Sequence, residues 1–306
     1  MPRCRDATRI GLLVVSWCCL GQLAAQPPGE LVKRSKAASS TPAVIDTRFV
    51  QVRPAPKEEF ALARSQGQAR AVVLVHGLRL HPFSADNVNK AGLQDWQKTG
   101  SVLVRLLAKY ADVYAFAYSE NVPLDAVADT PPLDISIWRL KQLGYREIVL
   151  IGHSAGGVIV REYVEDHPQS SVTKVIEVCA PNEGSGFARL DAPVRKGQRP
   201  FLASLTHEAR AAIEKQRLGK RIPPGLQFVC VVGDGAGAGD GLVANTSQWP
   251  DDLQAQGIPA VALRTTHFTV MRNKSEAERL AELVRQPQPR WSPAKVAAVR
   301  KILCHK

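Results

Sequence analysis

The chain has 306 residues, 45% of them hydrophobic, and a formal net charge of +12 at pH 7. This length allows one or two domains with a sizeable core, and the composition is ordinary for a soluble globular protein. The basic charge favours contact with anionic surfaces, but no zinc-finger spacing, RNA-binding signature or basic aromatic-rich stretch occurs, which argues against a nucleic-acid partner.

The N-terminus has the order of a secretory signal peptide. A basic start at residues 3–9 is followed by an apolar run at 10–20 and by the small residues Ala24 and Ala25. The run is short for a membrane span, so we expect residues 1–25 to be removed and the protein to be exported to the periplasm or secreted. A retained N-terminal membrane anchor is the alternative.

Two stretches of different character come next. Residues 26–65 are rich in Pro, Ser, Ala and Lys and predict a flexible leader with one strand at Ala43–Val52. From 66 to 285, apolar strand-like runs alternate with helical spacing. Strands are predicted at 71–75, 112–118, 147–151, 172–180, 226–232 and 259–264. Helices are predicted at 103–110, at 131–143, after Ser154 to about 167, and from a capping box at Ser275 and Glu278.

This alternation predicts an α/β fold, a mostly parallel sheet with helices on both faces. Functional side chains should gather at the carboxyl ends of its strands. A helix-rich excursion at residues 183–225 is either a small lid or pocket wall, or a cover for the sheet. No large cap domain is expected. Residues 286–306 predict a linker and a basic tail helix.

Three cysteines remain after the expected signal peptide, Cys179, Cys230 and Cys304. An odd number rules out complete pairing within the chain, and the first two lie in apolar runs typical of buried thiols. No CxxC or HExxH motif occurs, so we expect no metal and no cofactor. The sequence carries no signal of oligomeric state.

The segment GHSAGG directly follows the predicted strand at 147–151 and precedes a helix. A Gly-x-Ser-x-Gly pattern in this context predicts a sharp strand-to-helix turn that holds Ser154 at the edge of the sheet. Gly152 and Gly156 leave room for the turn, and the helix N-terminus favours developing negative charge. A tight glycine-rich turn with an incidental serine is the alternative explanation of this pattern.

An earlier segment, VLVHGL at 73–78, closes a strand with His76 and Gly77. A tetrahedral intermediate needs two preorganised N–H donors. The backbone N–H groups of Leu78 and Ala155 can form this pair, and His76 is expected to brace the loop.

A serine hydroxyl also needs a base, and the base needs an acid to orient it. Asp240, in GAGDGLVA, and His267, in RTTHFTV, each lie in a loop after a predicted strand. Both positions are therefore at carboxyl ends of strands, on the same rim as Ser154. Asp234 follows the same strand as Asp240 and is the alternative acid.

In chain order, HGL, GHSAGG, DGLV and TTH resemble the oxyanion strand, nucleophile elbow, acid loop and histidine loop of α/β-hydrolases, most closely of their lipase and esterase branch. The resemblance implies that Ser154 is the nucleophile, Asp240 the acid and His267 the base. It also implies that Leu78 and Ala155 supply the oxyanion hole.

The resemblance spans about residues 70–285 and implies cleavage of a carboxylic ester or lipid through an acyl-serine intermediate. An acyltransferase or thioesterase with the same three residues is the alternative function. A non-catalytic relative that binds a polymer or protein is a third. The chain departs from the lipases at Asn182, where they usually carry a histidine.

Overall fold

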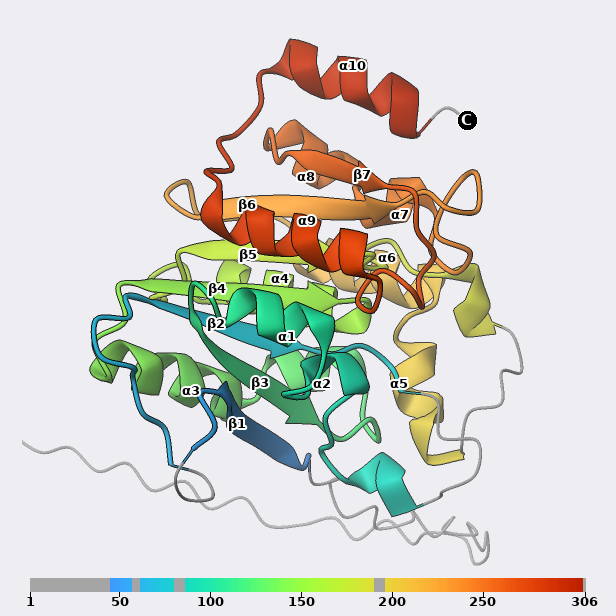
Figure 1. Cartoon of the computed structure of the whole chain (residues 1–306). Coiled ribbons are helices and arrows are strands. Elements are labelled where there is room, and N and C mark those ends of the chain that lie inside the picture. The colour runs from blue at the N-terminus through green and yellow to red at the C-terminus, as the bar shows by residue number, and fades with distance from the viewer. Residues whose placement is uncertain (1–44, 57–60, 80–85, 190–195, 305–306) are drawn as a thin grey trace, which may run out of the picture. The chain divides into compact units, whose positions relative to one another are not determined.

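A computed structural model describes residues 45–56, 61–79, 86–189 and 196–304 (Figure 1). The expected signal peptide and most of the expected leader lie outside these ranges. Within them, no helix is both long enough and apolar enough to cross a lipid bilayer.

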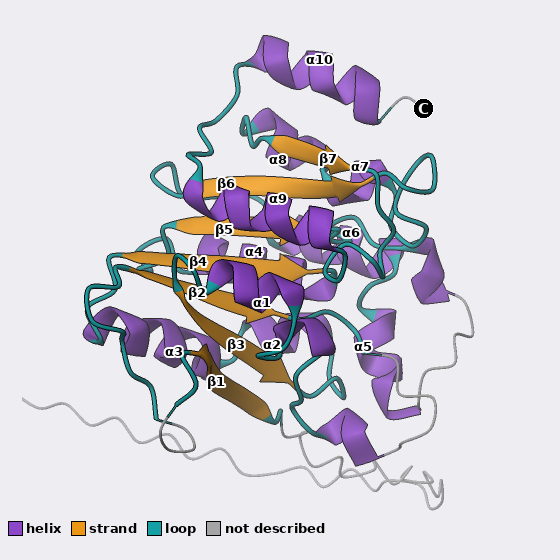
Figure 2. Ribbon diagram, viewed as in Figure 1, coloured by secondary structure: helices purple, strands orange, loops and turns teal. Residues whose placement is uncertain are grey.

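Seven strands of the described residues form one sheet in the order β1-β3-β2-β4-β5-β6-β7 (Figure 2). β1 runs antiparallel to β3, and every other neighbouring pair is parallel. The strands are β1 Thr47–Arg53, β2 Arg70–Val75, β3 Asp112–Tyr118, β4 Glu147–His153, β5 Lys174–Val178, β6 Gln227–Gly233 and β7 Ala260–Leu263. The predicted α/β fold is confirmed.

The central strands are nearly continuous apolar runs because helices cover both faces of the sheet. Every residue of β3 and β5 is buried, and so is all of β2 after its first residue. β1 lies at the sheet edge, and most of its residues are partly or fully exposed. The sheet thus forms a rigid platform that fixes the loops at its carboxyl edge.

Each face of the sheet carries its own hydrophobic cluster. α1 (Val102–Leu107) and α9 (Lys274–Arg285) pack on one face and lie in front of the sheet in Figure 1. α3 (Pro131–Gln142) and α4 (Ala155–Asp166) pack on the other face. The shorter elements that connect the strands and longer helices are η1 Asp86–Asn89, η2 Asp95–Gln97, α2 Leu124–Ala128, α7 Asn245–Gln248 and α8 Asp251–Ala255.

The predicted excursion at 183–225 consists, in its described part, of short helices. They are η3 Gly186–Arg189, η4 Lys196–Gln198, α5 Arg199–Ala203 and α6 His207–Gln216. The predicted tail helix is α10 (Pro293–Leu303), which buries Val296 and Leu303. Its N-terminus is capped by Ser292, whose hydroxyl accepts a hydrogen bond from the N–H of Lys295.

Two sequence expectations need correction. The strand expected at Ala43–Val52 is β1, and because it pairs with β3, this part of the 26–65 range belongs to the sheet and not to a flexible leader. The capping box at Ser275 and Glu278 is wrong, because α9 already begins at Lys274. The Ser275 hydroxyl instead donates to the neighbouring Glu276 carboxylate.

Candidate active site

Ser154 lies at the junction of β4 and α4, where the chain turns sharply. Its backbone has φ 56° and ψ −128°, an unfavourable conformation for a residue with a side chain. The turn is held by hydrogen bonds from the Ser154 N–H to the Val178 carbonyl and from the Gly157 N–H to the Ser154 carbonyl, both 2.8 Å. Strain of this kind at one serine is typical of a nucleophile elbow.

The flanking glycines are required by close backbone contacts. A Cβ atom at Gly152 would lie 2.3 Å from the Gly156 carbonyl oxygen. A Cβ atom at Gly156 would lie 2.4 Å from the carbonyl oxygens of both Val75 and His76. The first turn of α4 therefore packs directly on the end of β2, which brings Ser154 beside the loop that follows β2.

We expect Gly156→Ala to lower the free energy of unfolding by about 1–3 kcal/mol, because the added methyl group overpacks this contact. The same substitution at an exposed glycine inside a helix would instead raise the free energy of unfolding by up to about 1 kcal/mol, because alanine favours the helix. Gly186→Ala is the control, since a Cβ atom there has no neighbour within 4 Å. Urea unfolding measures both variants, and a Gly156→Ala protein as stable as the wild type would contradict the contact.

His267 connects Ser154 to Asp240. Its Nε2 lies 2.9 Å from the Ser154 Oγ, and its Nδ1 lies 2.7 Å from the Asp240 Oδ2. The three side chains are buried. The backbone N–H of His267 also donates a hydrogen bond to the backbone carbonyl of Asp240 at 3.0 Å. With the proton on Nδ1 donated to Asp240, the Nε2 lone pair faces the serine hydroxyl and can accept its proton.

The Asp240 carboxylate is held in place to accept a hydrogen bond from His267. Its Oδ1 accepts hydrogen bonds from the N–H groups of Leu242 (2.9 Å) and Val243 (2.8 Å). Burial acts to raise the pKa of Asp240, but the hydrogen bond and charge of His267, together with these two N–H groups, hold it below its usual value. The carboxylate is therefore ionised in the neutral range.

The alternative acid, Asp234, lies elsewhere in the same loop. Its Oδ1 accepts a hydrogen bond from the Asn245 side chain at 3.1 Å, and the residue is only partly buried. Asp240 is thus the carboxylate that the structure brings to His267.

His153, the residue before Ser154, forms a hydrogen bond with the backbone of His267. Burial first, and the charge of His267 second, lower the pKa of His153 to about 3, so its ring is neutral. Its Nε2–H donates to the His267 carbonyl at 3.1 Å, and its ring packs edge-on against Trp96. The residue beside the serine therefore positions the backbone of His267 rather than exchanging protons with Ser154.

The loop after β2 lies against the nucleophile. A Cβ atom at Gly77 would be 2.5 Å from the Ser154 Cβ. None of the described residues accepts a hydrogen bond from the Leu78 N–H, and Ala155, as the first residue of α4, has no partner for its N–H inside the helix. The two predicted oxyanion donors are therefore available beside Ser154.

His76 contacts the loop after β2 and the end of β3. It is fully buried, and its ring stacks on Tyr118 with centroids 4.3 Å apart. Its Nδ1–H donates to the Gly77 carbonyl at 2.7 Å, while the Tyr118 hydroxyl donates to the His76 carbonyl at 2.6 Å. The ring therefore fixes the backbone just before Leu78.

A small pocket opens at Ser154 and His267, and its lining is mostly apolar. Much of one wall comes from the excursion after β5, and the rest from the loop after Asp240. The apolar residues of these two segments are Phe187, Ala188, Leu202, Leu205, Leu242 and Val243. A second, more polar pocket shares Leu78, His267 and Phe268 with the first. Phe268, 55% exposed, lies where the two meet.

One trio of described ligand-type side chains lies close enough together to hold a metal ion, Cys179, Asp240 and His267. Two of its members already share the hydrogen bond described above. Burial first, and the Asp240 carboxylate second, raise the pKa of Cys179 well above its usual value, so the thiol stays protonated. The trio therefore suits an acid–base pair with a neutral sulfur behind it better than a metal centre.

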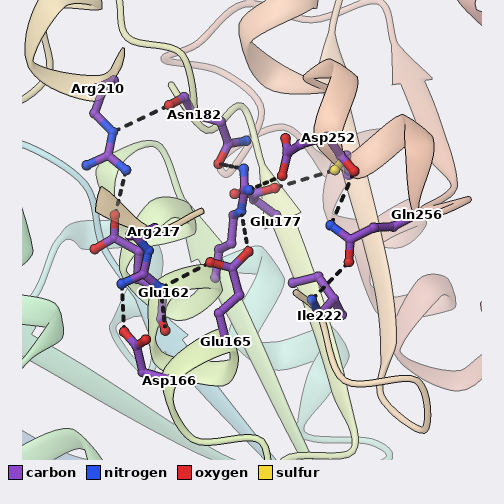
Figure 3. A network of polar contacts seen from close by, with 12 residues as sticks. Glu162, Glu165, Asp166, Glu177, Asn182, Arg210, Arg217, Ile222, Asp252 and Gln256 are labelled. Carbon is purple, nitrogen blue, oxygen red and sulfur yellow. Dashed lines mark hydrogen bonds and ion pairs between the residues drawn. The ribbon is translucent and has the colours of Figure 1, made fainter. Parts of the chain in front are cut away.

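A network of buried and half-buried charged side chains lies between α4 and α6 (Figure 3). Glu162 pairs with Arg210 at 2.5 Å, and Arg217 reaches Glu165 at 3.0 Å and Asp166 at 2.7 Å. Asn182, the residue where lipases usually carry a histidine, accepts a hydrogen bond from Arg161. No sequence motif marks this network, which ties the excursion to α4.

The chain belongs to the alpha/beta hydrolase family, whose sequence profile matches residues 72–304. Among solved structures, the lipase BlEst2 of Bacillus licheniformis in its mature form is similar over 78% of this chain and 98% of its own, with 15% identity and a TM-score of 0.58. Its propeptide form matches over 82% of this chain and 56% of that longer chain, with 14% identity and a TM-score of 0.56.

An esterase of Pyrobaculum calidifontis matches over 79% of this chain and 84% of its own, at 15% identity and a TM-score of 0.49. At 14–15% identity, the likeness to the two BlEst2 structures establishes the fold alone. A comparison with curated protein sequences found no match. The chain is thus an alpha/beta hydrolase that shares its fold with the lipase BlEst2.

Proposed function

We propose that this protein is a serine hydrolase of the lipase or carboxylesterase type, with Ser154 as nucleophile, His267 as base and Asp240 as acid. One observation carries the proposal. An unbroken hydrogen-bonded line runs from the Asp240 carboxylate through both ring nitrogens of His267 to the Ser154 hydroxyl, at 2.7 and 2.9 Å.

In the proposed reaction, the Ser154 Oγ attacks the ester carbonyl carbon while His267 Nε2 takes its proton. The oxyanion accepts hydrogen bonds from the N–H groups of Leu78 and Ala155. The carbon–oxygen bond to the alcohol then breaks, and the alcohol leaves with the proton held by His267. Water attacks the acyl-serine by the same route and releases the carboxylic acid.

The apolar pocket beside Ser154 suits the acyl chain of an ester, since binding there removes the hydrocarbon and the apolar side chains from water and so stabilises the complex. An ester panel from p-nitrophenyl acetate to palmitate, run beside Ser154→Ala, tests the activity. Turnover of at least one ester that the variant loses supports the proposal. Equal rates for both proteins on every ester would refute it.

We expect Ala188→Leu to lower kcat/KM for an octanoate ester about tenfold or more relative to acetate. Ala188 lines the pocket, and the added carbons displace part of the longer chain. Ala203→Leu is the control, because Ala203 is exposed on α5 and does not line the pocket. An unchanged ratio in Ala188→Leu would show that the acyl chain binds elsewhere.

We further propose that residues 1–25 direct export and that the excursion at 183–225 forms the pocket wall of the catalytic domain. Removal of residues 1–25 takes away three arginines and one aspartate, so the exported protein keeps a net charge of +10 (12 − 2), which supports contact with anionic surfaces. An N-terminus near Gln26 in protein recovered outside the cytoplasm would support export.

A further inference from the structure

The orientation of the Gly77–Leu78 peptide decides whether the Leu78 N–H can serve as an oxyanion donor. The Gly77 carbonyl oxygen accepts two hydrogen bonds, from His76 Nδ1 at 2.7 Å and from Gln94 Nε2 at 3.1 Å. A trans peptide is planar, with its C=O and N–H pointing in opposite directions. Fixing the Gly77 oxygen therefore fixes the direction of the Leu78 N–H.

The Gln94 amide is itself held in one orientation. Its Oε1 accepts a hydrogen bond from the indole N–H of Trp96 at 2.7 Å, so Nε2 is the atom that faces Gly77. The Gln94 backbone N–H donates to Gln97 Oε1 at 2.9 Å. Gln97 is fully buried and anchors to the Leu74 carbonyl of β2. The support for Gly77 thus leads back to the sheet.

The peptide on the other side of Leu78 is fixed by Glu120, which follows β3 and is fully buried. Glu120 Oε1 accepts hydrogen bonds from the Arg79 backbone N–H at 2.9 Å and from Arg79 Nε at 3.1 Å. Gln198 donates to Glu120 Oε2 and to the Arg79 carbonyl, both at 2.6 Å. Both backbone polar groups of Arg79 are therefore held by side chains.

We propose that Gln94 and Glu120 are positioning residues that hold the Leu78 N–H in the direction required by the oxyanion. They act through the backbone of the loop after β2 and do not touch the reacting atoms. This inference rests on the proposed function, because it presupposes that an oxyanion forms beside Ser154. It adds that transition-state stabilisation depends on two side chains outside the Ser-His-Asp set.

The test uses Gln94→Leu, which removes the donor to Gly77 at a half-buried position, and Glu120→Gln, which removes the carboxylate charge. Burial raises the pKa of Glu120 to about 7 against the lowering effect of Arg79, so the assays are run above that pH. Loss of a whole oxyanion donor costs about 10²–10³ in kcat. We expect misdirection of one donor to lower kcat about 10- to 100-fold, with KM changed less than about twofold.

A trifluoromethyl ketone that forms a tetrahedral adduct with the serine provides the second measurement. Its affinity should fall by the same factor as kcat, because it uses the same donor as the transition state. The double variant should lose less than the product of the two single losses, since both changes act on one N–H. Urea unfolding of each variant establishes that the protein is folded at the assay temperature.

Two matched controls address a general structural effect. Gln256→Leu removes a half-buried glutamine that also hydrogen-bonds the backbone, at Ile222 (Figure 3). Glu147→Gln removes the charge of another Glu–Arg pair, with Arg70, at the start of β4. Both should keep kcat and ketone affinity within about twofold of wild type.

The inference is overturned if Gln94→Leu and Glu120→Gln keep wild-type kcat, or if they raise KM alone. It is also overturned if the controls lose as much activity as the two test variants. Wild-type activity that depends on Ser154, found together with any of these results, would leave the proposed function intact. Absence of that dependence would instead remove the proposed function itself.

Discussion

Replacing Ser154 by alanine should lower kcat on p-nitrophenyl esters by about 10³-fold or more. The change removes the hydroxyl that forms a hydrogen bond with His267 Nε2 and leaves its neighbours in place. The free energy of unfolding should change little, because alanine keeps the same strained backbone conformation and only the hydroxyl is lost. Initial rates and urea unfolding on the same preparation separate the two effects.

Ser185→Ala is the matched control. Ser185 lines the same apolar pocket, but its hydroxyl donates to the Leu242 carbonyl and does not contact His267. We expect its kcat to fall less than about tenfold. A Ser154→Ala protein that keeps a near-normal rate, or a larger loss in Ser185→Ala, would assign the chemistry to another residue.

Replacing Asp240 by asparagine should lower kcat by about 10²–10⁴-fold. The ionised carboxylate accepts the Nδ1–H of His267 and stabilises the positive ring that forms when His267 takes the serine proton. An asparagine amide can turn its NH₂ group toward Nδ1, which favours the wrong tautomer and places the proton on Nε2. The loss should appear in kcat more than in KM, since this side chain is buried and does not line the pocket beside Ser154.

Asp234→Asn is the control for the same loop. Its carboxylate accepts a hydrogen bond from Asn245, and the structure brings Asp240 rather than Asp234 to the base. The variant should retain kcat within about tenfold of wild type. A larger loss in Asp234→Asn than in Asp240→Asn would move the acid to position 234.

Most of the sheet could be predicted from sequence because its strands are buried on both faces. Runs such as 71–75 and 113–118 are short and rich in β-branched or aromatic residues, which favours a buried strand over a buried helix segment. The start of α9 differs from the Ser275–Glu278 pattern because Asn273, two residues earlier, is the N-cap residue. The strand order is a property of long-range pairing and was not predicted.

The side chains of the candidate site could be located from sequence because they follow strands whose carboxyl ends share one rim. Asp240 and His267 are 27 residues apart in the chain, yet the parallel pairing of β6 with β7 brings their loops together. Gln94 and Glu120 could not be found in this way. Their roles depend on single hydrogen bonds to backbone atoms, and no motif marks such contacts.

The most direct test of the account is to label the protein with a fluorophosphonate and map the modified peptide by mass spectrometry. An activated serine attacks phosphorus and displaces fluoride, which leaves a stable covalent adduct. We expect one adduct per chain, on Ser154, absent from Ser154→Ala and formed far more slowly in His267→Ala. An adduct on another residue, or a fully active protein that takes no label, would contradict Ser154 as the nucleophile.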